Sequence, residues 1–178
     1  MKEKIFTLFD MIKKYVLNQP SLKDVIDDKF IQQQTDVITN NYIIHKTLGT
    51  EKSDFSIIEF WFKNISVKSI RMISLGDYIV KIRLYDSGSI DVLFYQYTFD
   101  ELGGKYLTEA EHPHIQKGKA CWGSYESQVY NSLYSANFIA GLSNIRRFLC
   151  SYYGRSVYTA GKFFERTAYY PTKYQQFK

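Results

Sequence analysis

The sequence predicts a single α+β domain in which helices precede and follow a run of β-strands. Three observations predict this class: apolar residues at helical spacing near the N-terminus, alternating apolar and polar residues in the middle, and helical spacing again after about residue 125. The 178 residues include 16 Tyr and 13 Phe, and 45% are hydrophobic, which is ample material for a packed core.

A first helix is expected at the N-terminus and should end before Pro20, because a proline disfavours the α conformation in the residue before it. Ser21 is a candidate N-cap for a second, short helix. The apolar face of the first helix comprises Ile5, Leu8, Phe9, Ile12 and Val16, and the second would bury Leu22, Val25 and Ile26.

Strands are expected from about residue 35, where β-branched and aromatic residues become frequent. The segments richest in them are 37–44, 55–62, 67–73, 78–85 and 90–95. The short turn Asp86-Ser87-Gly88-Ser89 between the last two favours an antiparallel meander of about four strands. Trp61, between two phenylalanines, is expected in the core.

The remaining chain is predicted to be an irregular stretch followed by helices. Residues 126–134 should form one helix, and Asn137 should cap the next, in which Cys150 near the end is expected to be buried or half-buried. A final helix is expected at 157–166. The expected parts are 1–34 (helical), 35–100 (meander), 101–124 (His-Pro-His and Cys loop), 125–167 (helices) and 168–178 (tail).

Composition narrows the classes of partner. The formal net charge is +5, but acidic residues are interspersed among the basic ones, a pattern that does not favour nucleic acid. No apolar run approaches the length of a membrane span, so no membrane partner is expected. Two cysteines cannot form the disulfide framework of a small secreted domain, and the expected compartment is the cytoplasm.

The chemically suggestive segment is Glu-His-Pro-His-Ile-Gln-Lys-Gly-Lys-Ala-Cys-Trp-Gly, residues 111–123. His112 and His114 are two residues apart, so in extended backbone they point to the same side. Gly118 lets the chain reverse and can bring Cys121 back toward them. The neighbouring Lys117 and Lys119 would favour the thiolate, which is the nucleophilic form.

Three interpretations of this segment remain open. In the first interpretation Cys121 is a nucleophile or acyl carrier, with His114 orienting the loop or stabilising an oxyanion. Alternatively His112, His114 and Cys121 bind zinc, which needs a fourth ligand. In the third interpretation Pro113 forms a turn, the histidines bond the loop backbone, and Cys121 and Trp122 are packed.

The order His112-Pro113-His114, a glycine-bearing turn and Cys121 resembles the active-site segment of ubiquitin-conjugating enzymes, where a His-Pro-Asn tripeptide precedes the thioester-forming Cys. More specifically, the segment resembles divergent UBC/RWD-type proteins of bacteria and phages that carry His-Pro-His and Cys-x-Gly. The resemblance covers residues 103 to about 165. It implies the UBC layout of N-terminal helix, meander, active-site stretch and C-terminal helices.

The resemblance implies that Cys121 accepts the C-terminus of a ubiquitin-like protein as a thioester and passes it to an amine. His112 and Pro113 would shape the loop, and His114 would take the place of the oxyanion-stabilising Asn. The implied partners are a ubiquitin-like protein and its activating enzyme, with no cofactor. Two alternatives stay open: a non-catalytic binding or assembly module of the same fold, located in the virion if it is a phage structural protein, and a small zinc-stabilised domain.

Overall fold

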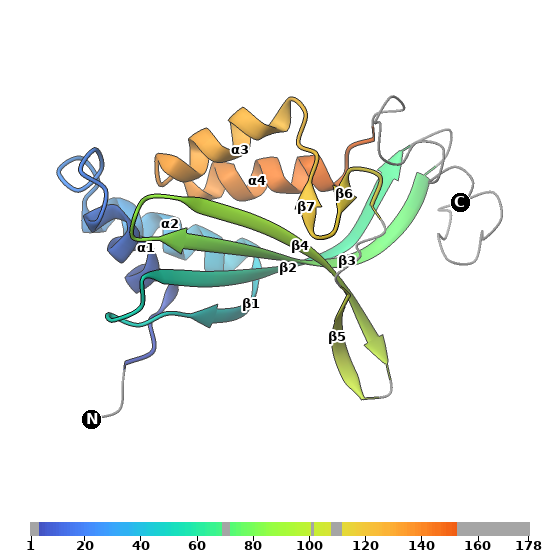
Figure 1. Cartoon of the computed structure of the whole chain (residues 1–178), viewed down its shortest axis with the longest axis horizontal. Helices are drawn as coiled ribbons and strands as arrows, with labels where there is room; N and C mark the ends of the chain where they lie inside the picture. Colours follow the sequence, from blue (N-terminus) through green and yellow to red (C-terminus); the bar gives the residue numbers. More distant parts are fainter. Residues whose placement is uncertain (1–3, 69–71, 101, 108–111, 153–178) are drawn as a thin grey trace.

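The computed structural model describes residues 4–68, 72–100, 102–107 and 112–152, and it confirms the α+β class (Figure 1). The described helices are α1 (Leu8–Leu17), α2 (Asp28–Asn41), α3 (Tyr125–Tyr134) and α4 (Phe138–Leu149). The strands are β1 (Ile43–Leu48), β2 (Phe55–Lys68), β3 (Met72–Tyr85), β4 (Ile90–Asp100), β5 (Gly103–Leu107), β6 (Ile115–Gln116) and β7 (Lys119–Ala120). The helix expected at 157–166 and the tail at 168–178 lie outside the described residues.

The strands form an antiparallel meander with the order β1-β2-β3-β4-β5, five strands where about four were expected. The separate strand expected at 67–73 is wrong. Val67 lies near the end of β2 and pairs with Ile73 near the start of β3, so these residues belong to two different long strands. Val67 and Ile73 are both β-branched, so composition alone did not show that they belong to different strands.

The first helix is confirmed, although Ile5, expected on its apolar face, precedes it and is 73% exposed. The second expected helix is wrong. Thr7 and Asp10 form a capping box that starts α1. Residues 20–25 form turns, and Val25, expected inside a helix, is 79% exposed. The helix that follows is α2, whose N-cap Asp27 accepts a hydrogen bond from the Phe30 backbone N–H at 2.8 Å.

The strand expected from residue 37 also begins later, because α2 continues to Asn41. Ile31, Gln34 and Ile38 are buried at helical spacing, so packing of this face outweighs the β preference of the segment's Val, Ile and Thr residues. Gln34 is tied to α4, since its Oε1 accepts from the Ile139 backbone N–H at 3.1 Å.

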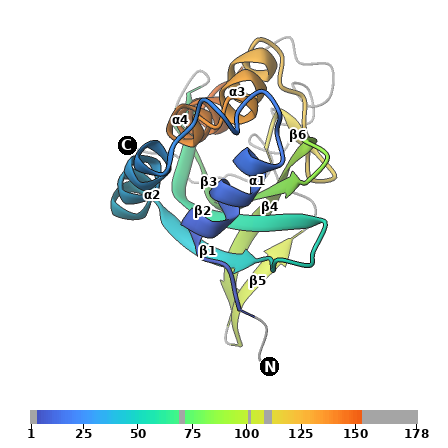
Figure 2. The same ribbon diagram turned by 90° about the vertical axis from the view of Figure 1, so that its left-hand side faces the viewer.

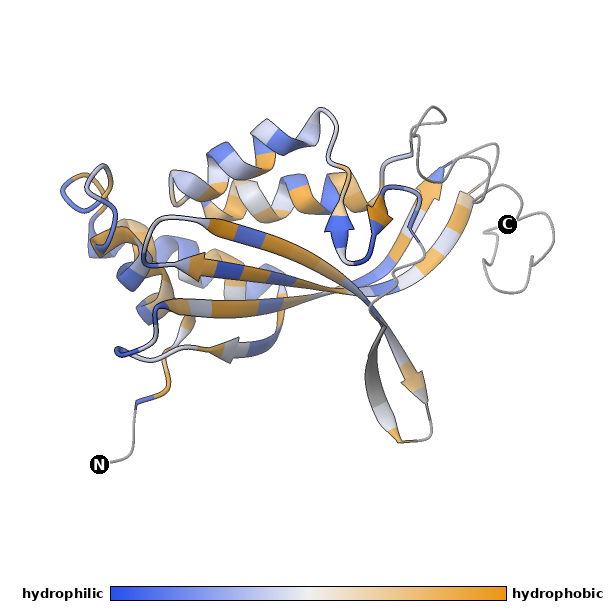
Figure 3. Ribbon diagram, viewed as in Figure 1, coloured by the Kyte–Doolittle hydropathy of each residue, from blue (hydrophilic) through white to orange (hydrophobic). Residues whose placement is uncertain are grey.

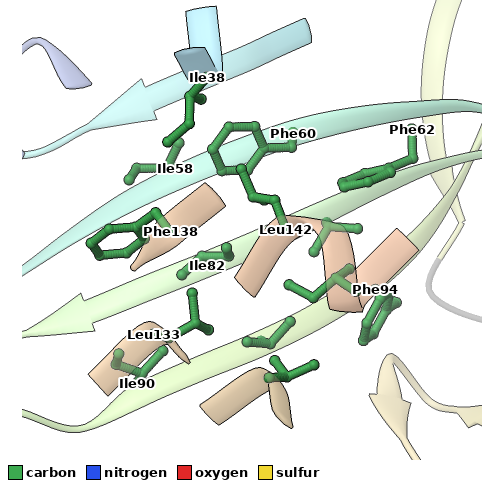
Figure 4. Packing of buried hydrophobic residues seen from close by; sticks show 14 of the residues in the cluster. Ile38, Ile58, Phe60, Phe62, Ile82, Ile90, Phe94, Leu133, Phe138 and Leu142 are labelled. Atoms are coloured by element: carbon green, nitrogen blue, oxygen red, sulfur yellow. The ribbon is translucent and has the colours of Figure 1, made fainter. Parts of the chain in front are cut away.

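The core lies between the helices and one face of the sheet. Hydrophobic and hydrophilic residues alternate along the central strands (Figure 3). Phe60 of β2 and Ile82 of β3 lie on the face of the sheet that α4 covers, in one cluster with Phe138 and Leu142 of α4 (Figure 4). Within α4, Gly141 allows a close approach, because a Cβ there would lie 2.5 Å from a methyl of Leu133 in α3. The two helices lie side by side (Figure 2).

The stretch expected to be irregular contains three strands. β5 pairs with the distal half of β4, and this β4–β5 hairpin projects away from the body (Figure 1). β6 and β7 form a small separate hairpin on the same side of the sheet as α3 and α4 (Figure 1). The second hairpin carries the residues singled out from the sequence.

Candidate functional site

The β6–β7 hairpin is held against the sheet by its turn. Lys117 and Gly118 both have positive φ, 50° and 77°, the pattern of a tight two-residue hairpin turn. The carbonyl of Gly118 accepts a hydrogen bond from the Phe94 backbone N–H at 2.8 Å, on the edge of β4 that β3 does not use. A Cβ on Gly118 would lie 3.2 Å from the Phe94 carbonyl oxygen, so glycine suits this position for its conformation and its size.

His112 is a structural residue with both ring nitrogens engaged. Its Nδ1 accepts from the His114 backbone N–H at 3.0 Å, and its Nε2 lies 2.7 Å from the Leu149 carbonyl oxygen. Because a carbonyl can only accept, the proton is on Nε2. Burial lowers the pKa of His112 to about 3, with the Leu149 carbonyl opposing that shift and His114 adding to it. The ring is therefore neutral and stacks on Phe148.

His114 is also buried, at 3% exposure, with its ring near those of Phe148 and Tyr152. Burial lowers the pKa of His114 below its ordinary value. Its backbone joins the two arms of the hairpin, since the Cys121 N–H donates to the His114 carbonyl at 2.7 Å. Between the histidines, the Ile115 N–H donates to the His112 carbonyl at 3.3 Å and closes a turn around Pro113.

Cys121 is exposed. It lines an open groove of about 640 Å³ together with Lys117, Lys119 and Glu126, which are also exposed. Lys119 begins the two-residue strand β7, and Cys121 follows directly after that strand. The groove therefore places a thiol next to ammonium groups and one carboxylate, all accessible to solvent.

The structure thus brings the predicted residues together through the backbone but separates their side chains. The imidazoles of His112 and His114 are buried, whereas the thiol of Cys121 is on an exposed residue. The turn at Pro113 and the reversal at Gly118 are as expected from the sequence. The bonds of the His112 ring to backbone and the packing of Trp122 match the third interpretation, and the exposure of Cys121 does not.

Phe148 is the residue that sequence reasoning missed. Its ring centroid is 4.7 Å from that of Trp122 and 5.6 Å from that of His112, so it joins the hairpin to α4. It lies one residue before Leu149 in α4, and both side chains are buried. Cys150 is the C-cap of α4 and is exposed, so the expectation of a buried or half-buried thiol is wrong.

The arrangement of His112, His114 and Cys121 does not favour the zinc interpretation. In the described part of the chain, no group of three or more His, Cys, Asp and Glu side chains is arranged to hold a metal ion. A zinc ion on His112 would have to displace the Leu149 carbonyl or the His114 amide from a ring nitrogen.

The fold and site together define an α+β protein with an antiparallel sheet and an exposed cysteine on a hairpin that two buried histidines hold in place. No protein-family model, no curated protein and no solved structure matches the chain. Among the described helices, none combines the length and apolar character that crossing a membrane requires.

Proposed function

We propose that the protein carries an acyl group on Cys121 as a thioester, as a ubiquitin-conjugating-like carrier does, and passes it to an amine. The observation that supports this proposal is the contrast within one hairpin. Cys121 is open to a groove, while the chain before it is held rigidly by His112 and His114 in the core. A rigid support beneath an exposed nucleophile is what acyl transfer to a large protein donor needs.

The chemistry consists of two balanced exchanges. The Cys121 thiolate attacks the carbonyl carbon of the donor thioester, a new C–S bond forms, and the donor's sulfur leaves as a thiolate that takes up a proton. An amine then attacks the same carbon, an amide forms, and the Cys121 thiolate is released. Both exchanges pass through a tetrahedral intermediate that carries negative charge on oxygen.

The roles of the surrounding residues follow from where their side chains lie. His112 and His114 are positioning residues, because their rings are buried and the thiol is not. The oxyanion role that the resemblance assigns to His114 passes, in this proposal, to Lys119, which lines the same groove as Cys121. Glu126 lines the same groove, and in this proposal its carboxylate receives the proton of the attacking amine.

The test is thioester exchange with a synthetic peptide α-thioester as acyl donor. We expect acylation of Cys121, reversed by free thiol, and abolished in Cys121→Ser. Cys150→Ser is the matched control, since Cys150 is the other free and exposed cysteine, and this variant should be acylated like the parent chain. Equal acylation of both cysteines would leave the exchange unselective and would contradict the proposal. The remaining interpretation would then be a non-catalytic binding module.

A further inference from the structure

The outer face of the sheet, turned away from the helices, carries a second small apolar cluster. Trp61 lies between Phe60 and Phe62, both of which point into the main core, so the indole is on the opposite face. The expectation that Trp61 belongs to the core is therefore wrong. Ile79 pairs with Trp61 and is fully buried on this outer face. The outer cluster is defined as His45, Trp61, Ile79, Tyr97 and Phe99.

Trp61 is held rigidly at the centre of the outer cluster. Its Nε1–H donates to Asp77 Oδ2 at 3.0 Å, and Asp77 Oδ1 accepts from the Asn64 backbone N–H at 2.8 Å. The rings of Tyr97 and Phe99 lie 5.3 and 5.4 Å from the indole, centroid to centroid. A fixed indole surrounded by aromatic rings resembles the anchor of a protein interface, because little side-chain entropy is lost when a partner covers it.

Large apolar side chains are exposed around this anchor. Phe99 is 60% exposed, and Ile43, directly opposite Trp61 on β1, is 44% exposed. Leu48, further along β1 on the same face, is 51% exposed. Ile43 and Phe99 lie on the same face as Trp61 and extend the outer cluster, whereas a charged row of Lys46, Glu59 and Lys81 separates Leu48 from Trp61. Large apolar side chains exposed together on one face are typical of an interaction site.

Two lysines at the edge of the outer cluster indicate the charge of the partner that it binds. Lys63 lies 4.3 Å from the Trp61 ring, and Lys46 is exposed on the same face. Among the described residues, neither lysine has a carboxylate within 4.0 Å. The acidic residue opposite Lys46 is Glu59, which is 5% exposed and paired with Lys81. The rim therefore presents positive charge to a partner.

From this arrangement we infer that the outer cluster is the docking surface for an acidic protein segment with apolar side chains. A second copy of the chain fits poorly, because each copy carries a net charge of +5 and would face the same lysines. Single-stranded nucleic acid fits poorly as well. Ile43 and Leu48 have no π-face, and the rings of Trp61 and Tyr97 meet nearly edge-on, at 77°, rather than forming flat stacking platforms.

The inference does not depend on chemistry at Cys121, because the outer face and the β6–β7 hairpin are on opposite sides of the sheet. The experiment uses two fluorescent synthetic peptides with the same alternating Leu and Phe residues, one carrying Glu and the other Lys at the remaining positions. Anisotropy should show the acidic peptide binding at least roughly tenfold more tightly, with the difference shrinking at high salt.

Phe99→Ser should weaken acidic-peptide binding, and Lys63→Glu should remove the preference between the peptides. Val25→Ser, at a side chain 79% exposed outside the outer cluster, is the control and should bind like the parent chain, as should Cys121→Ser. Absence of binding, equal binding of both peptides, or insensitivity to Phe99→Ser would overturn the inference. So would tighter binding of oligo-dT than of the acidic peptide, or self-association in sedimentation that Phe99→Ser abolishes.

Discussion

The Nε2–H of His112 donates to the carbonyl of Leu149, 37 residues further along the chain, at 2.7 Å. This bond joins the base of the β6–β7 hairpin to the last turn of α4, where carbonyls have no partner within the helix. One buried imidazole thus satisfies a helix end through Nε2 and a loop amide through Nδ1. The position of Cys121 depends on this link, because its own amide bonds to the next histidine.

His112→Ala should destabilise the fold strongly. The substitution leaves a cavity beside Phe148 and removes the partners of a buried carbonyl and a buried amide, for an expected loss of about 3 kcal/mol in the free energy of unfolding. Urea unfolding followed by circular dichroism measures it. Ser127→Ala, an exposed position on α3, is the control and should change stability by less than about 0.5 kcal/mol. A comparable small change for His112→Ala would show that the bond does not matter.

Stability should fall in mild acid because of the same residue. The folded-state pKa of His112 is lowered from 6.5 to about 3, so the unfolded chain binds a proton in a pH range where the folded chain does not. The contribution of His112 to the free energy of unfolding is fully present above about pH 6.5. It is lost as the pH falls toward 3, at up to about 1.4 kcal/mol per pH unit. The lowered pKa of His114 acts in the same direction. Unfolding free energies measured across this window should have a shallower slope in His112→Ala, and an unchanged slope would refute the assignment.

Gly118→Ala should cost more than Gly123→Ala, although both glycines have positive φ, 77° and 56°. A Cβ meets nothing within 4 Å at Gly123 but lies 3.2 Å from the Phe94 carbonyl oxygen at Gly118. The shared strain of about 1 kcal/mol should appear in both variants. The additional loss in the free energy of unfolding of Gly118→Ala, measured by chemical unfolding, reports the contact with β4. Equal losses in the two variants would mean that the hairpin moves away from β4 without an energetic penalty.

Charge reversal in the groove should change which reagents reach Cys121. In Lys117→Glu/Lys119→Glu, alkylation of Cys121 by anionic iodoacetate should slow several-fold relative to neutral iodoacetamide at low salt, because nearby exposed charges act within the screening length. The ratio of the two rates is measured by mass spectrometry of the cysteine peptides. The ratio at Cys150 is the internal reference and should not change, and a constant ratio at Cys121 would place the lysines outside its electrostatic reach.

Local chemistry in the sequence predicted the features that depend on neighbouring residues. The reversal at Gly118, the turn at Pro113 and the Asn137 cap of α4 are all present, the last with its side chain accepting from the Ala140 N–H. Long-range packing decided the rest. Helical burial of Ile31 and Ile38 outweighed β preference in α2.

The candidate site was only half predictable for the same reason. Sequence spacing indicated that His112, His114 and Cys121 approach one another, and their backbones do. The burial of the two histidine rings depends on Phe148 and Leu149, which are more than thirty residues away from both in the sequence. The face of the sheet on which Trp61 lies could not be predicted either, because a Phe-Trp-Phe triplet does not show which of its residues point toward the helices.

The most direct test of the central claim compares alkylation of the two exposed cysteines in the folded protein. Under limiting iodoacetamide at neutral pH, the proposal predicts that Cys121 is modified several-fold faster than Cys150, and that unfolding in urea makes the two rates equal. Equal rates in the folded protein, or faster modification of Cys150, would contradict the claim that the His112-anchored hairpin presents a nucleophile.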